Sequence, residues 1–184
     1  MGIKIILISG KARHGKDSTA KFIKQRLEAK GNKVLITFFG DLLKYILTKY
    51  FNWDGKKDEN GRTLLQTIGT DVVRKQKPNY WVDFLVELFT LFEREWDYVI
   101  IPDVRFRNEC ERFIGFDTIN IRVERLNFQS PLTPKQQKHP SETELDNYEH
   151  FDYIIRAESG LDNLEREVNR FMTWLEKQSA LVDS

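Results

Sequence analysis

Residues 3–18 read IKIILISGKARHGKDS, and this stretch decides the fold. Residues 3–9 are a short apolar run rich in isoleucine and bounded by glycine, which is typical of a buried strand. Residues 10–18 nearly match the phosphate-binding pattern G-x-x-x-x-G-K-[ST], and a helix-like segment follows. The departure is Asp17, which stands where the pattern has a hydroxyl residue, with Ser18 one place later. Strand, glycine loop and helix in this order predict a nucleotide phosphate site.

The chemistry of this loop explains its residues. Gly10 and Gly15 let the backbone turn so that successive N–H groups face phosphate oxygens, and the following helix directs its positive end there. Lys16 would place its charge against the β and γ phosphates of ATP. Asp17 or Ser18 would hold Mg²⁺, because each offers oxygen to a hard cation. The predicted ATP-binding residues are Gly10, Lys11, Ala12, Arg13, His14, Gly15, Lys16, Asp17 and Ser18. The alternative is a simple glycine turn with a solvated lysine.

Hydrophobic periodicity organises the rest of the chain. Four further apolar segments predict strands, at 34–39, 97–103, 117–125 and 151–156. Helical spacing marks segments at 17–30, 41–51, 63–76, 79–95 and from 161 onward. Strands separated by helices predict one α/β domain over residues 1–184, with a five-stranded, largely parallel sheet covered by helices on both faces. Residues 126–150 hold three of the five prolines and predict a loop or mobile lid.

Composition limits the classes of function. The chain has 184 residues, 40% hydrophobic and 31% charged, with a net charge of +1. This balance predicts a soluble globular protein and does not favour nucleic-acid binding. The apolar run near the N-terminus is only about seven residues and contains Lys4, so neither a signal peptide nor a membrane span is expected. A lone cysteine, Cys110, fits a reducing cytoplasm and a packing role.

A second acidic position follows the strand predicted at 97–103. In YVIIPDVR, residues 98–105, Asp103 ends the strand where phosphoryl-transfer folds keep an acid near Mg²⁺. Arg105 could form a bidentate fork to a phosphate. The alternative is that Asp103 caps a helix beginning near Val104. Because parallel strands end at one edge of a sheet, Asp103, the 10–18 loop and the 126–150 segment should meet.

Three motifs together resemble a known family. GKARHGKDS (10–18), LLQTIGTDVVRKQKPNYWV (64–82) and YVIIPDVRFRNE (98–109), in this order, are similar to the deoxynucleoside monophosphate kinases of phages and bacteria. The middle motif discriminates most, since a generic phosphate-loop protein has no reason to carry it. GKD in place of GK[ST] is itself a trait of that family. Phosphomevalonate kinases and dephospho-coenzyme A kinases carry similar loops, and the resemblance is weak over 126–150.

The resemblance implies a fold, a reaction and a set of residues. The fold would be a P-loop nucleoside monophosphate kinase-like three-layer sandwich, with an acceptor region near 41–81 and a lid near 126–150. The reaction would move the γ-phosphoryl group of MgATP to a (deoxy)nucleoside 5′-monophosphate, giving the diphosphate and ADP. The implied catalytic residues are Lys16, Asp103, Arg105 and Arg125, with Arg122 as a further lid arginine. The implied acceptor residues are Asp41, Lys44, Gly69, Thr70, Asp71, Arg74, Trp81 and Arg105; those near Mg²⁺ are Asp17, Ser18 and Asp103.

Several alternatives stay open at this level. Gly69 could relieve crowding, Trp81 could belong to the core, and Arg122 could lie on a solvated strand face. The protein could instead be a kinase for another small acceptor, or bind ATP without catalysis. ATP and a nucleotide are the expected partners, with no nucleic acid or membrane. The sequence leaves open the base, the sugar, the oligomeric state (a homodimer included) and whether the origin is bacterial or phage. The expected location is the cytoplasm, which would be that of the host if a phage encodes the protein.

Overall fold

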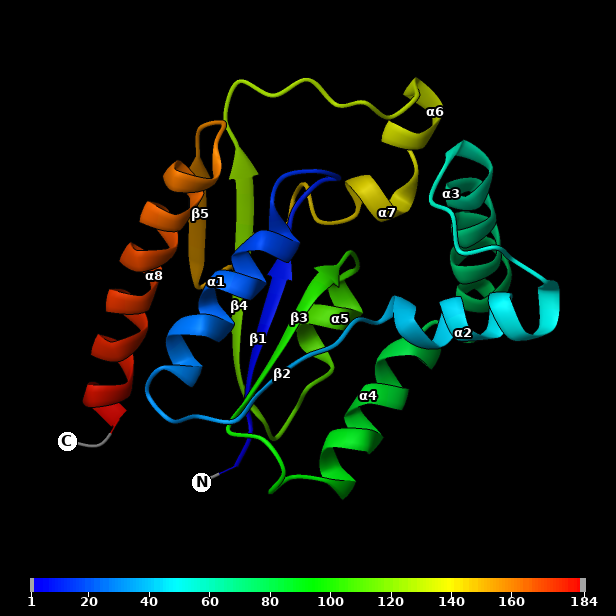
Figure 1. The fold of residues 1–184 in the computed structure, drawn as a ribbon. Helices are drawn as coiled ribbons and strands as arrows, with labels where there is room; N and C mark the ends of the chain where they lie inside the picture. The colour runs from blue at the N-terminus through cyan, green and yellow to red at the C-terminus, as the bar shows by residue number, and fades with distance from the viewer. Residues whose placement is uncertain (1, 183–184) are drawn as a thin grey trace.

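A computed structural model describes residues 2–182, and its centre is one five-stranded sheet (Figure 1). The strands are β1 (Lys4–Ser9), β2 (Val34–Ile36), β3 (Tyr98–Val104), β4 (Asp117–Arg125) and β5 (Tyr153–Ala157). They run in the order β2-β3-β1-β4-β5, and every neighbouring pair is parallel. The predicted α/β class is therefore confirmed, with a sheet that is parallel throughout rather than largely so. The second strand is shorter than expected, because it ends at Ile36.

Helices cover both faces of the sheet because its strands are apolar on both sides. In β1, Ile5 and Leu7 face one core, while Ile6 and Ile8 face the other. The core containing Ile6 and Ile8 is closed by α1 (Lys16–Glu28) and α8 (Leu161–Val182). The opposite core is closed by α2 (Gly40–Phe51), α4 (Tyr80–Leu91) and α5 (Arg107–Glu111) (Figure 1). This three-layer arrangement leaves the carboxyl ends of β1, β3 and β4 at one edge.

The connection from β2 to β3 is helical as predicted, but its helices have different bounds. The helix predicted over 63–76 begins earlier, as α3 (Glu59–Gln66), whose N-terminus is capped by Asp58 through a 2.8 Å bond from the Gly61 N–H. Residues 67–74 then widen into a π-helix, η1 (Thr67–Arg74). A π-helix is rare and is frequently found at functional sites. Apolar periodicity does not distinguish it from an α-helix.

The 126–150 segment divides into two parts. Its first part is mostly exposed and arches from β4 to the short helix α6 (Pro134–Gln137) (Figure 1). The second part begins with α7 (Pro140–Thr143), and Leu145 and Tyr148 are buried in the core on the α4 side. The predicted lid can therefore involve only the first part without opening the core. Among residues 2–182, no helix combines the length and apolar character needed to cross a bilayer.

Candidate active site

The loop after β1 has the geometry of a phosphate cradle. Its backbone has positive φ at Gly10 (146°), Arg13 (62°) and Gly15 (96°), and α1 begins directly afterwards at Lys16. At Gly10 a Cβ would lie 2.5 Å from the carbonyl oxygen of Val123 in β4, so only glycine fits there. The loop therefore turns tightly over the end of the sheet, with the N-terminus of α1 open to an anion.

Lys16 is the first residue of α1, and its side chain reaches back to the loop. Its side chain is buried, and Nζ donates a 2.9 Å hydrogen bond to the carbonyl oxygen of Lys11. Burial, followed by the nearby charge of Arg105, lowers the pKa of Lys16 to about 7, although Glu142, Asp17 and Asp103 act in the opposite direction. Because nearby negative charges offset little of the cost of burying this ammonium, a bound phosphate would stabilise its charged form.

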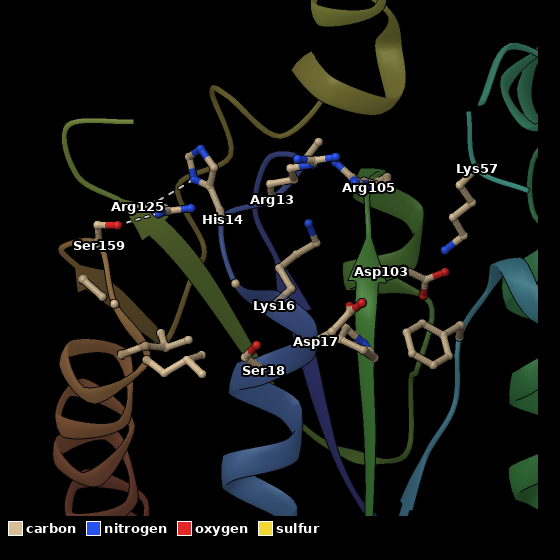
Figure 2. A pocket seen from close by; sticks show the side chains of 18 of the residues that line it. Arg13, His14, Lys16, Asp17, Ser18, Lys57, Asp103, Arg105, Arg125 and Ser159 are labelled. Carbon is tan, nitrogen blue, oxygen red and sulfur yellow. Dashed lines mark hydrogen bonds between the residues drawn. The ribbon is translucent and has the colours of Figure 1, made fainter. Parts of the chain in front are cut away.

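A cavity of about 690 Å³ opens in front of the loop (Figure 2). Of the nine predicted ATP-binding residues, seven line it: Ala12, Arg13, His14, Gly15, Lys16, Asp17 and Ser18. Gly10 and Lys11 lie behind this lining, beside α7. The cavity also reaches the loop between β5 and α8, where it is lined by Ser159 and Gly160. It is thus bounded by the ends of β1, β3, β4 and β5 at the predicted edge of the sheet.

Arg125 lies on the side of this cavity away from Asp103 (Figure 2). Its Nη2 donates to Ser159 Oγ at 2.6 Å, and its guanidinium lies 4.5 Å from the centre of the Phe128 ring. The backbone N–H of Arg125 donates to His14 Nδ1 at 3.2 Å. Burial and, next, the charge of Lys16 lower the pKa of His14, which favours the neutral ring that can accept this bond. The end of β4 is therefore tied to the phosphate loop.

The three predicted Mg²⁺ ligands line the same cavity, so the residues present fit the ion. Asp17 and Ser18 belong to the first turn of α1, and Asp103 approaches from β3 (Figure 2). Their donor atoms are all oxygens, which suits a hard cation that usually keeps one or two carboxylates plus substrate phosphates. Among residues 2–182, no cluster of three or more His, Cys, Asp or Glu residues could enclose a metal without such help.

Asp103 also has a structural role. Its two carboxylate oxygens accept hydrogen bonds of 2.9 Å from the N–H groups of Phe39 and Gly40. It therefore caps α2 from β3 rather than a helix near Val104, which was the alternative expected from the sequence. Burial raises the pKa of Asp103, and the two N–H donors oppose that rise. Each oxygen retains lone-pair capacity for a further partner.

A second cavity, of about 230 Å³, lies between α2, η1, α4 and the end of β3. The predicted acceptor residues that line it are Lys44, Gly69, Thr70, Arg74, Trp81 and Arg105. Asp41 and Asp71 do not line either of the two cavities, and both are exposed. Asp41 instead accepts bonds from the Phe38 N–H and from Lys44 Nζ. The motif around Gly69 thus reaches the cavity, but these two carboxylates point elsewhere.

Trp81 and Gly69 are also packing residues. Trp81 is only 4% exposed, and its Nε1 donates a 3.0 Å bond to the carbonyl oxygen of Gly69. A Cβ at Gly69 would lie 2.6 Å from Leu43 Cδ2, so the glycine lets η1 pack against α2. Trp81 therefore belongs to the core, and Gly69 relieves crowding against α2, as the alternatives from the sequence held. Both residues still line the cavity.

Arg122 is turned away from both cavities. Its Nη1 donates to the carbonyl oxygen of Leu145 at 2.8 Å, and its guanidinium pairs with Glu124 and Asp146. These bonds attach the buried part of the 126–150 segment to β4. The structure therefore places Arg122 behind the phosphate loop, beside Gly10 and Lys11, and not in the wall of either cavity, because local carboxylates and a carbonyl engage its guanidinium.

Sequence reasoning missed several charged residues at the site, including Arg62 and Glu158, which line the larger cavity. Lys57 comes from a turn that reads only as polar, yet it lines both cavities. Glu109 is 1% exposed, pairs with Arg74, and accepts bonds from the N–H groups of Arg105 and Phe106. Burial raises the pKa of Glu109, and Arg74 opposes the rise. Glu142 on α7 pairs with Arg105. The motif RFRNE, which resembles the family, was the available signal for Glu109. No local sequence pattern indicated Lys57 or Glu142 as site residues.

The two cavities share part of their walls. Lys44, Lys57, Asp103 and Arg105 line both. A ligand in the larger cavity and one in the smaller would therefore meet beside three cations and one carboxylate. This arrangement can bring two anionic groups together and neutralise their repulsion.

Comparisons with known proteins agree with this geometry. No curated protein matches the chain. Dephospho-CoA kinase from Campylobacter jejuni has a similar structure, with a TM-score of 0.52 and 13% identity over 92% of this chain and 96% of that one. The APS kinase of Mycobacterium tuberculosis, in complex with AMPPNP and APS, aligns with a TM-score of 0.47 and 14% identity over 94% and 98%. The first likeness supports the P-loop kinase fold.

A family model described as deoxynucleotide monophosphate kinase matches residues 44–168, which is more than half of the chain. The match includes the η1 motif, β3 and the 126–150 segment, and it begins after the phosphate loop, so the geometry of that loop is independent support. The resemblance predicted from three motifs is confirmed: the chain belongs to the deoxynucleotide monophosphate kinase family and is a kinase-type phosphotransferase.

Proposed function

We propose that the protein transfers the γ-phosphoryl group of MgATP to the 5′-phosphate of a (deoxy)nucleoside monophosphate, releasing the diphosphate and ADP. The observation that carries this proposal is the shared wall of the two cavities. ATP would occupy the larger cavity, with its phosphates on the loop, and the acceptor would occupy the smaller one. Its phosphate would then meet the γ-phosphate beside Lys44, Lys57 and Arg105.

Phosphoryl transfer of this kind needs positioning and positive charge more than covalent chemistry. The acceptor phosphate is already an anionic nucleophile, so the site needs no general base. Lys16 would bind the donor phosphates from the loop, while Arg105 would contact the group in transit from β3. Holding donor and acceptor in line is the main source of rate in such a site. Arg125, at the opposite side of the donor cavity, would bind ATP away from the acceptor.

Mg²⁺ fits between α1 and β3, where Asp17, Ser18 and Asp103 would hold it. When bound, the ion would neutralise part of the phosphate charge. Asp17 would bring the nearest uncommitted carboxylate to the ion, since Asp103 already accepts two N–H groups. The exposed first part of the 126–150 segment would act as a lid and limit the entry of water.

A coupled assay of ADP release tests the proposal. MgATP is supplied with a panel of dNMPs, NMPs, dephospho-coenzyme A and mevalonate 5-phosphate. Turnover is expected with one or more nucleoside monophosphates, and Lys16→Ala should abolish it. Lys21→Ala removes an equal charge from an exposed position of α1 and serves as the matched control. Turnover only with a non-nucleotide acceptor, or none at all despite ATP binding, would contradict the proposal.

A further inference from the structure

Arg105 is held at one nitrogen of its guanidinium. Nη1 donates to the carbonyl oxygen of Gly10 at 3.2 Å, to the carbonyl oxygen of Ser141 at 3.4 Å and to Glu142 Oε1 at 2.8 Å. Within residues 2–182, the hydrogen bonds of this guanidinium all involve Nη1. Its Nε and Nη2 therefore form the edge that remains for a ligand, and these two N–H groups match a phosphate in bidentate fashion.

Glu142 is the charged member of this set. Its side chain is 8% exposed, and Oε2 accepts a 3.0 Å bond from the N–H of Ala12 in the phosphate loop. The carboxylate therefore bridges the loop and Arg105, with one oxygen on each. Because the Ala12 N–H fixes the direction of the carboxylate, Oε1 is left facing Nη1. The shortest of the three contacts to Nη1 is the one that carries opposite charge.

Glu142 is not part of the wall of the proposed ATP cavity. It lies on the side of the loop that faces α7, and it does not line either the donor or the acceptor cavity. The backbone of Arg105 is held separately, because its N–H donates to Glu109. Glu109 thus fixes where the residue leaves β3, and Glu142 fixes how its guanidinium is rotated.

We propose that Glu142 is a positioning residue for phosphoryl transfer: by holding Nη1, it presents the Nε and Nη2 edge of Arg105 to the phosphate at the boundary of the two cavities. This inference rests on the proposed function for the identity of the group in transit. Without Glu142, the guanidinium rotates about its long side chain, and the fork is aligned for only part of the time. Misplacement of a catalytic group by about 1 Å can cost roughly 100-fold in rate.

The test separates orientation from support of the fold. Glu142→Ala should lower kcat by about 10- to 100-fold and change the KM of the acceptor much less. Glu144→Ala is the matched control, because it truncates the same type of side chain at an exposed position two residues away and should leave kcat unchanged. Thermal unfolding of both variants shows whether the native state persists. An unchanged kcat in folded Glu142→Ala would overturn the proposal.

A double-mutant cycle with Arg105→Lys is decisive. Lysine keeps a positive charge but has no planar fork to orient. If Glu142 acts through the fork, adding Glu142→Ala to Arg105→Lys should change kcat by no more than about twofold. Full additivity of the two losses would mean that Glu142 supports the site in general, and would refute the assignment. The cycle uses whichever acceptor the wild-type protein turns over, so a wrong acceptor class and a wrong role for Glu142 give different results.

Discussion

Replacing Gly10 by alanine tests the account of the phosphate loop. The φ of Gly10 is 146°, and the new Cβ would lie 2.5 Å from the carbonyl oxygen of Val123. This oxygen belongs to β4, where Val123 pairs with Ile155 of β5, so it cannot move without disturbing the sheet. Backbone strain costs about 1–3 kcal/mol and overpacking about 1–3 kcal/mol. The free energy of unfolding should therefore fall by about 2–6 kcal/mol.

Gly31 provides the matched control. Its φ is also positive, at 84°, but no heavy atom lies within 4 Å of the Cβ position. Gly31→Ala should cost only backbone strain, about 1–2 kcal/mol. For a chain of 184 residues, each kcal/mol lowers Tm by about 2–4 °C. We therefore expect losses of about 4–24 °C for Gly10→Ala and about 2–8 °C for Gly31→Ala.

Thermal unfolding followed by circular dichroism, with urea titration as a second measure, distinguishes the two variants. The clash makes Gly10→Ala the less stable of the pair. If Gly10→Ala proves as stable as Gly31→Ala, the end of β4 can shift to accommodate the methyl group. The contact with the Val123 carbonyl oxygen would then not require glycine at position 10.

Three further predictions concern charge and packing at the site. The pKa of Lys16 in the free protein is about 7, and bound phosphates favour its protonated form, so ATP binding near about pH 8.5 should take up about one proton. Calorimetry in buffers of different ionisation enthalpy measures this proton uptake. Equal uptake by the Lys16→Met variant would contradict the assignment. Lys57→Ala should raise the KM of the acceptor about tenfold. Lys56→Ala should not, because the ammonium of Lys56 pairs with the exposed Asp54. Equal effects of the two variants in steady-state kinetics would show that Lys57 is not part of the site. Trp81→Phe loses the bond to Gly69 and should lower stability by about 1–2 kcal/mol in urea unfolding; unchanged stability with a raised acceptor KM would make Trp81 a substrate contact instead.

The parts of the fold that were predictable from sequence are those governed by local patterns. The apolar run before Gly10, the two loop glycines and the helix after them act within a few residues of one another, and the structure reproduces that order. Parallel strands then required their carboxyl ends to meet, which correctly placed Asp103 at the cavity of the loop.

What could not be predicted depends on contacts between distant parts of the chain. Asp103 binds N–H groups 63 and 64 residues away, and Glu142 binds the Ala12 N–H 130 residues away. The π-helical turn of η1 accompanies close packing of Gly69 on Leu43, which periodicity does not encode. The exposure of Asp71 has the same origin: the motif indicated a binding helix, but only the packing of that helix decides which side chains face the cavity.

The anchoring of the 126–150 segment has a consequence for how such a protein can diversify. The segment leaves the phosphate loop at Arg125, whose N–H binds His14, and returns to it at Glu142, which binds Ala12. The stretch between these anchors is a loop whose two ends are held two residues apart on the phosphate loop, at His14 and Ala12. Lengthening a closed loop costs free energy only with the logarithm of its length. Relatives can therefore differ in the length and sequence of this stretch while the phosphate-binding loop keeps its conformation.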